Sequence, residues 1–222
     1  MSIKENYQKI RSEIGDNVMI IVAVKGRTKE EIEEVIDAGA QDLGENYVQE
    51  AESIYESLGD KVGKVRWHMI GHLQKNKINK ALQIFDVIQT IDSKGIALAL
   101  NERAKRIGKV VPVYIEMNIG DEMTKSGVKG EYEVVEGLAK EISKMEFLRL
   151  EGLMAMEPQF DNPQDSISCF KKAKDIFERI GALNLPNVDM KELSMGMSGS
   201  YKIAIQEGSN MVRLGSAIFG AR

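Results

Sequence analysis

The sequence has a single cysteine, Cys169, and only two histidines. One cysteine excludes an internal disulfide framework, and no Cys/His spacing typical of a bound metal is present, so we expect no metal site. Cys169 lies in a stretch with helical periodicity. We predict that it is a half-buried structural thiol in a reducing compartment.

Long apolar runs and an excess of charge of one sign are also missing. No segment approaches the length of a membrane span, and the first eleven residues are charged and mixed, without the apolar core of a secretory signal. The 30 basic and 34 acidic side chains give a net charge of -4. The sequence therefore has no excess of basic side chains that would attract a nucleic-acid backbone or an anionic membrane. We therefore expect a cytoplasmic monomer without nucleic-acid or membrane partners.

Apolar residues make up 43% of the 222 positions, enough to bury one large core. Short apolar runs alternate along the chain with stretches of helical periodicity. The predicted strands are residues 18–24, 40–43, 65–70, 87–91, 110–118, 148–154, 192–195 and 211–214, after a leading amphipathic helix at 3–14. Eight β-then-α units predict one α/β domain over residues 1–222, a closed (β/α)8 barrel of the TIM type with an extra N-terminal helix. A doubly wound open sheet is the alternative, because the alternation of strands and helices alone does not distinguish a closed barrel from an open sheet.

The first predicted strand ends at a lysine. Seven apolar residues, Val18 to Val24, run without a break into Lys25 and Gly26. Such a run is typical of a strand buried on both faces, so Lys25 stands at the carboxyl end of that strand. Partial desolvation there would favour the free amine, which attacks carbonyl groups. We predict that Lys25 is the reactive centre; a solvated lysine that opens a loop is the alternative.

Polar side chains end most of the other predicted strands. In a barrel the carboxyl ends of the strands form one face, and this face carries the chemistry. Besides Lys25, the residues predicted there are Glu45, Asn46, His68, Gln89, Thr90, Asn118, Met154, Ser194 and Arg213. No paired carboxylates stand at the positions of a glycosidase, which favours amine chemistry over hydrolysis. His68 is a candidate general acid or base, and a hydrogen-bonded core histidine is the alternative.

Glycines and serines follow the last two predicted strands. Residues 193–200 are Leu-Ser-Met-Gly-Met-Ser-Gly-Ser, and Gly215-Ser216 follow the eighth strand. Loops at these two positions form the recurrent phosphate site of the barrel fold, because backbone N–H groups and a helix dipole converge there. The sequence predicts a bound phosphate ester within reach of Lys25. The candidate contacts are Met195, Ser198, Gly199, Gly215 and Ser216; tight turns without a ligand are the alternative.

Arg213 ends the eighth predicted strand and is expected to point into the same mouth. A lysine, a phosphate cradle and a cationic partner for a ring together indicate pyridoxal 5'-phosphate (PLP), held by an imine at one end and by its phosphate at the other. Neither a G-x-G-x-x-G fingerprint nor Walker A spacing follows the first strand, so nucleotide binding lacks sequence support.

Five segments resemble the pyridoxal phosphate homeostasis protein family. They are residues 43–50 (LGENYVQE), 67–74 (WHMIGHLQ), 124–127 (TKSG), 193–199 and 212–220. The resemblance spans nearly the whole chain and implies a single barrel similar to the N-terminal domain of alanine racemases. It also implies that Lys25 forms the aldimine, that Ser198, Gly215 and Ser216 lie near the phosphate, and that Arg213 faces the pyridine nitrogen. The chain departs from many members at residues 24–28, where VKGRT replaces SKTKP, and at Ser200, where an acidic residue is common.

The family resemblance implies a protein that holds PLP, buffers it and delivers it, with PLP-dependent apo-enzymes as candidate recipients and with little or no catalysis. A PLP-dependent amino-acid racemase is the alternative, and the sequence pattern alone also leaves a lysine aldolase open. Against racemisation, an arginine at the ring nitrogen weakens the electron sink, and the sequence stops at Arg222 without the second domain that gives racemases their tyrosine base. Lys125, in the long polar loop 119–130, is a candidate second contact with the cofactor; a solvated loop lysine is the alternative.

Overall fold

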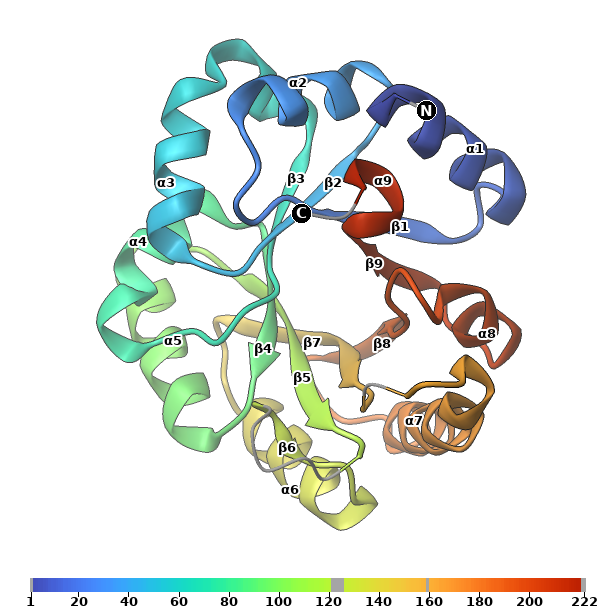
Figure 1. Ribbon diagram of the computed structural model, residues 1–222. Coiled ribbons are helices and arrows are strands. Elements are labelled where there is room, and N and C mark those ends of the chain that lie inside the picture. Colours follow the sequence, from blue (N-terminus) through green and yellow to red (C-terminus); the bar gives the residue numbers. More distant parts are fainter. Residues whose placement is uncertain (1, 121–125, 159, 221–222) are drawn as a thin grey trace.

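The computed structural model describes residues 2–120, 126–158 and 160–220. Within them, strands alternate with helices and close into a ring of parallel strands surrounded by helices (Figure 1). The barrel strands are β1 (Met19–Ala23), β2 (Asp42–Glu45), β3 (Arg66–Met69), β4 (Val87–Ile91), β5 (Val111–Asn118), β7 (Leu148–Met156), β8 (Val188–Ser194) and β9 (Met211–Leu214). β9 pairs with β1, and β4 pairs with β5, so that the ring is complete. The predicted (β/α)8 barrel is therefore confirmed, and the open sheet is excluded.

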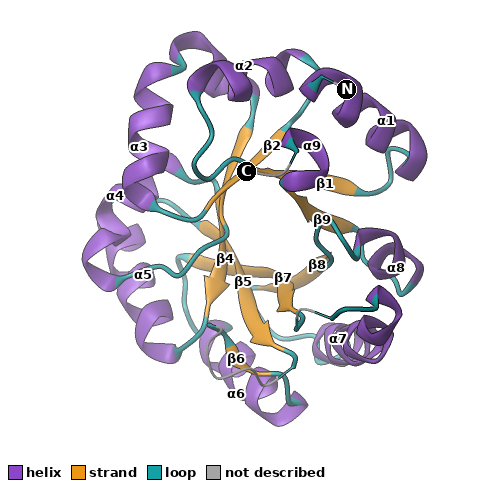
Figure 2. Ribbon diagram, viewed as in Figure 1, coloured by secondary structure: helices purple, strands orange, loops and turns teal. Residues whose placement is uncertain are grey.

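Helices cover the outside of the barrel, as Figure 2 shows. They are α1 (Ile3–Ile14), α2 (Lys29–Asp37), α3 (Val48–Ser57), α4 (Ile78–Ile84), α5 (Lys94–Arg106), α6 (Tyr132–Ile142), α7 (Ile167–Gly181), α8 (Tyr201–Gln206) and α9 (Ser216–Phe219). Short 3-10 helices lie at Gly59–Lys64, Lys75–Lys77 and Pro163–Ser166. The predicted leading helix is α1, which packs against α2 and α9.

Local sequence signals explain where the first two helices begin. The Thr28 Oγ1 accepts the backbone N–H of Glu31 at 3.3 Å, and Glu31 Oε2 accepts the backbone N–H of Thr28 at 2.8 Å. Ser2 and Glu5 form the same reciprocal pair before α1. Each cap satisfies backbone donors that a helix start leaves without partners, which contributes about 1 kcal/mol. Thr28 and Glu31 have the spacing of a capping box, and the structure contains both of its hydrogen bonds.

β1 buries both of its faces, which explains its continuous apolar run. In β1, Ile20 and Val22 pack in the core between the sheet and the helices, whereas Ile21 faces the barrel interior. The interior also holds Val87, Tyr114, Met154 and Met211. Successive side chains of a strand point to opposite faces, so both cores draw on the same short segments.

The structure differs from the predicted elements around β2. Ala40 does not open the strand, because its backbone N–H donates to the carbonyl of Val35 and closes α2. Gly44, predicted to begin a loop, lies inside β2. A Cβ at position 44 would stand 2.6 Å from Cγ2 of Ile21, so that only glycine fits against the neighbouring strand.

Other differences lie near the C-terminal half. β8 begins at Val188, four residues before its predicted start, because Asp189 and Lys191 alternate toward solvent with half-buried neighbours in an extended segment. A two-residue strand, β6 (Val128–Lys129), pairs with β5 inside the predicted loop 119–130. The short helix α9 was not predicted. Lys125 lies outside the described residues.

Candidate functional site

Lys25 lies at the mouth of the barrel, in the turn that follows β1. The strand ends at Ala23, and the side chain of Lys25 is exposed. The predicted partial desolvation of this lysine is therefore wrong: Gly26 adopts a positive φ of 62°, and the chain turns outward directly after the strand. The backbone N–H of Gly26 donates to Oε2 of Glu50 on α3 at 3.0 Å, which anchors the turn. Lys25 is thus an accessible amine on an anchored turn.

Glu45, at the end of β2, is buried close to this lysine. Its Oε1 accepts the backbone N–H groups of Asn46 at 2.6 Å and Tyr47 at 3.3 Å. Burial raises the pKa of the Glu45 carboxyl to about 7, although these hydrogen bonds and the charge of Lys25 lower it. Asn46, a predicted cofactor contact, is half-buried directly after β2 and lines a cavity of about 390 Å³. The structure therefore keeps Asn46 at the barrel mouth.

The two serine- and glycine-containing turns meet at Ser198. Its Oγ accepts the backbone N–H groups of Gly215 at 3.3 Å and of Ala217 at 3.1 Å, at the start of α9. Backbone donors and a serine hydroxyl that converge at a helix start are the groups that bind a phosphate. Ser216 is the first residue of α9, in the same turn. The structure thus brings together the residues predicted from the two separate turns.

The neighbouring residues of the first turn have different positions. A Cβ on Gly199 would meet no atom within 4 Å, so this glycine borders open space, and it lines a cavity of about 340 Å³ with Met156, Met197 and Ser200. Met195, by contrast, is fully buried in the core between the barrel and the helices. Its side chain does not reach the mouth, and the prediction of Met195 as a cofactor contact is not supported by its placement.

Arg213, on β9, is buried in the barrel, and its guanidinium donates hydrogen bonds to residues of β8 and β7. Its Nη1 donates to the carbonyl of Ser194 at 2.8 Å and to the Ser194 Oγ at 2.9 Å, and its Nη2 donates to the carbonyl of Ala155 at 2.9 Å. Burial lowers the pKa of the guanidinium, whereas the carboxyl groups of Glu157 and Glu116 raise it. Arginine remains a cation and a donor in such surroundings. The side chain is therefore a fixed positive charge below the mouth.

Glu116 is a functional candidate that sequence reasoning missed. It lies on β5, two residues after Tyr114 and on the same inward face, and it is 4% exposed. Burial and the neighbouring carboxyl of Asp92 raise the pKa of Glu116 to about 7, although the charge of Arg213 lowers it. Its Oε2 has no hydrogen-bond partner among the described residues. The signal that could have found it is the acidic residue at an inward position of an otherwise apolar strand.

His68 lies inside the barrel and not at the mouth. Its side chain is fully buried, with Nε2 2.9 Å from Oδ1 of Asp42 and Nδ1 3.0 Å from Nε2 of Gln89. Burial lowers the pKa of the imidazole, although the adjacent Asp42 raises it. With both ring nitrogens occupied, His68 has no nitrogen left to contact a ligand. The prediction of His68 as a cofactor contact is replaced by its alternative, a hydrogen-bonded core histidine.

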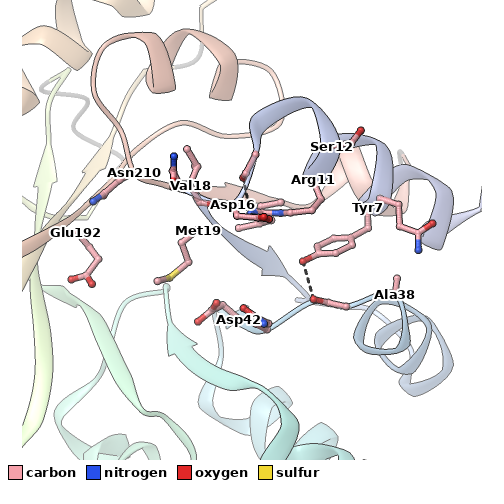
Figure 3. Close-up of a pocket in the computed structure, with 16 residues that line it drawn as sticks. Tyr7, Arg11, Ser12, Asp16, Val18, Met19, Ala38, Asp42, Glu192 and Asn210 are labelled. Carbon is pink, nitrogen blue, oxygen red and sulfur yellow. Dashed lines mark hydrogen bonds and ion pairs between the residues drawn. The ribbon is translucent and has the colours of Figure 1, made fainter.

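A larger cavity, of about 930 Å³, lies at the opposite end of the barrel (Figure 3). It is lined by α1, by the beginnings of β1 and β2, and by Glu192 and Asn210. Tyr7 closes one side by donating its hydroxyl to the carbonyl of Gly39 at 3.2 Å. In this fold the chemistry is carried by the carboxyl ends of the strands, so we place the functional site at the mouth around Lys25.

Two further findings concern only the described part of the chain. No group of three or more histidine, cysteine, aspartate or glutamate side chains is arranged there to hold a metal ion. The helices described are too short or too polar to cross a membrane. Cys169 is half-buried, and burial raises the pKa of its thiol.

Comparison with known proteins shows which family this chain belongs to. The family model described as "Alanine racemase, N-terminal domain" matches residues 1–222. The pyridoxal phosphate homeostasis protein of Pasteurella multocida is 37% identical over 232 residues, covering 100% of this chain and 98% of that protein. The protein of the same name from Escherichia coli K12 is 36% identical over 210 residues, covering 93% of this chain and 87% of that protein.

Solved structures agree with these relatives. PipY of Synechococcus elongatus, solved with PLP bound, is 28% identical with a TM-score of 0.89, covering 99% of this chain and 100% of that one. An alanine racemase of Clostridium difficile has a TM-score of 0.80 at 18% identity, and shares the fold over 100% of this chain and 57% of its own length. This chain therefore belongs to the alanine racemase N-terminal domain family, among the pyridoxal phosphate homeostasis proteins.

Proposed function

We propose that this protein binds PLP at the mouth of its barrel, buffers it, and delivers it to apo-enzymes, and so serves in vitamin B6 homeostasis. The observation that carries the proposal is the convergence of an amine, an anion cradle and a fixed cation at one face: Lys25, the Ser198 turn with the start of α9, and Arg213. These groups match the aldehyde, the phosphate and the ring of PLP. The relatives named as homeostasis proteins and the PLP-bound PipY structure support the same conclusion.

Each residue has a separate role in the proposal. Nζ of Lys25 forms an imine with the aldehyde carbon of PLP and water is released; addition of water reverses the step and frees the cofactor. Ser198, Gly215 and Ser216 bind the phosphate, and Asn46 and Gly199 border the bound molecule. The exposed position of Lys25 supports reversible exchange, because water reaches an imine formed there.

We also propose that the protein catalyses little or nothing. PLP, when bound, supplies an electrophilic aldehyde and an electron sink, and the sink is strongest when the pyridine nitrogen is protonated. Arg213 only donates hydrogen bonds, so it favours an unprotonated nitrogen. An amino-acid racemase remains the alternative, favoured by the shared fold of the alanine racemases. Turnover of either enantiomer of alanine at rates typical of dedicated enzymes would establish that alternative.

The experiment is a PLP titration of the purified protein, followed by absorbance and by mass spectrometry after borohydride reduction. We expect a stable adduct on the wild type that maps to Lys25 and is lost in Lys25→Ala. Lys144→Ala, at a lysine side chain that is 69% exposed, is the matched control and should retain the adduct. An adduct that persists in Lys25→Ala would refute the assigned lysine, and a wild type that takes up no PLP would refute the function. Incubation of the loaded protein with PLP-dependent apo-enzymes then tests delivery.

A further inference from the structure

A chain of hydrogen bonds crosses the barrel interior below the proposed site. It runs through Asp42, His68, Gln89, Ser194 and Arg213, which come from β2, β3, β4, β8 and β9; we call these five residues the relay. The successive distances are 2.9 Å from Asp42 Oδ1 to His68 Nε2, 3.0 Å from His68 Nδ1 to Gln89 Nε2, 2.8 Å from Gln89 Oε1 to Ser194 Oγ, and 2.9 Å from Ser194 Oγ to Arg213 Nη1. All five residues are buried, with Asp42 the most exposed at 7%.

The two ends of the relay, together with a neutral His68, determine the direction of every hydrogen bond in it. A carboxylate only accepts, so His68 must carry its proton on Nε2; a guanidinium only donates, so the Ser194 Oγ must accept from Arg213. Neutral His68 then has a lone pair on Nδ1, which accepts from the NH2 group of Gln89. The Gln89 oxygen is left facing Ser194, whose hydroxyl donates to it. In this arrangement all four hydrogen bonds form, and the Ser194 hydroxyl both donates and accepts within the relay.

The opposite arrangement leaves groups without partners. If His68 were protonated on both nitrogens, Nδ1 would donate, and the Gln89 amide would have to present its oxygen to His68 and its NH2 to Ser194. The Ser194 Oγ would then face two donors, Gln89 and Arg213, and its own hydrogen would lose its acceptor in the relay. A buried polar group without a partner costs about 1–3 kcal/mol.

The relay connects the two ends of the barrel. Asp42 lines the 930 Å³ cavity at the far end, together with Met19 and Glu192 (Figure 3). Arg213, at the other end, donates hydrogen bonds to carbonyls of β7 and β8 beneath the mouth. The remaining charged groups that act on His68 are Arg66 and Asp86.

We propose that the relay is a positioning device, in which Asp42, His68 and Gln89 act through Ser194 to hold the guanidinium of Arg213 in one orientation toward the ring of bound PLP. This role rests on the proposed function. It makes Asp42, His68 and Gln89 positioning residues, and they lie outside the cofactor site itself. A side chain with several rotatable bonds is kept at one angle because each acceptor around it is itself oriented.

The first test needs no cofactor. The sequence has only two histidines, His68 and the half-exposed His72, so 15N-edited long-range spectra of the PLP-free protein contain two imidazoles, which His72→Gln assigns. We expect His68 to remain neutral with its proton on Nε2 from pH 6 to pH 8. A proton on Nδ1 at pH 7, alone or together with Nε2, would overturn the direction of the relay.

The second test uses two variants of equal length at the centre of the relay. Gln89→Met removes the acceptor of Ser194, and we expect PLP retention about fivefold weaker, as for one hydrogen bond of about 1 kcal/mol. Gln89→Glu keeps that acceptor, so retention should return to within about twofold of the wild type. A glutamate accepts on both sides, so His68 should become protonated on both nitrogens in the same spectra.

A third variant tests the same role at a different position, so that the result does not depend on whether the variants at position 89 fold. Ser194→Ala removes the hydroxyl but leaves the carbonyl that also holds Arg213, and it should weaken PLP retention to a similar extent as Gln89→Met. Equal retention in the wild type, Gln89→Met and Ser194→Ala would overturn the positioning role, even with the expected His68 tautomer. A wild type that binds no PLP would instead refute the proposed function, and the spectra of His68 would still decide whether the relay is directed as described.

Discussion

Glu116 is expected to make the stability of the cofactor-free protein depend on pH. The perturbation is Glu116→Gln, which keeps the shape of the side chain and removes its ability to ionise. Oε2 of Glu116 has no hydrogen-bond partner among the described residues, so the substitution breaks no bond at that atom. The part of the change in the free energy of unfolding that depends on pH then reports the cost of a buried charge.

The magnitude follows from the pKa. Burial raises the pKa of Glu116 to about 7 from its ordinary 4.5. Below pH 4.5 the carboxyl is protonated in both the folded and the unfolded chain, so it imposes no penalty. As the pH rises, the unfolded chain loses this proton first, and stability falls until the pH passes the folded-state pKa. At ~1.4 kcal/mol per pKa unit, the full loss is about 3 kcal/mol.

The assay is urea unfolding of the PLP-free protein at pH 4.5 and pH 8.5. We expect Glu116→Gln to match the wild type within about 0.5 kcal/mol at pH 4.5 and to be more stable by about 3 kcal/mol at pH 8.5. Glu45, whose pKa is also raised to about 7, is common to both proteins and cancels in the difference. Glu146→Gln, at an exposed position, controls for the loss of one negative charge. The same stability difference at both pH values would refute the reasoning.

Three other outcomes follow from the geometry of the mouth. Ser198→Ala combined with Ser216→Ala should lower PLP affinity at least about tenfold in an absorbance titration, because two hydrogen bonds to a charged group are lost; unchanged affinity would place the phosphate elsewhere. Gly196→Ala should cost about 2 kcal/mol in urea unfolding, since residue 196 has φ of 91° and its new Cβ would lie 2.5 Å from a side chain of α8. Gly199→Ala, where the new Cβ meets open space, should have the same free energy of unfolding as the wild type. Equal losses of stability in Gly196→Ala and Gly199→Ala would contradict the argument. Arg213→Met should cost about 3 kcal/mol, because it leaves two buried carbonyls without their donor; a loss below about 1 kcal/mol would show that they find other partners.

Much of the fold could be predicted because its signals are local. The run before Lys25, the capping box at Thr28 and the glycines that follow several helices, such as Gly39 after α2, depend on neighbours within a few residues. They mark the β-then-α units along the chain. Lys25, the two serine-containing turns and Arg213 already indicated PLP, and the resemblance to a family added the role of the protein in PLP homeostasis. The ends of the strands were predicted less well than their order. In β2, packing against Ile21, and not the local pattern, decides where a glycine lies.

The sequence by itself therefore determined the order of the elements, the polar residues at the strand ends and the two serine-containing turns. Only the tertiary structure decided closure, because β1 and β9 pair residues that are far apart in the chain, such as Ile21 with Arg213. It also decided that Lys25 is exposed, that His68 is a core residue and that Glu116 is buried with one carboxyl oxygen, Oε2, lacking a hydrogen-bond partner among the described residues. Exposure and hydrogen bonding depend on which strands become neighbours in the closed ring, and no periodicity along the chain encodes them.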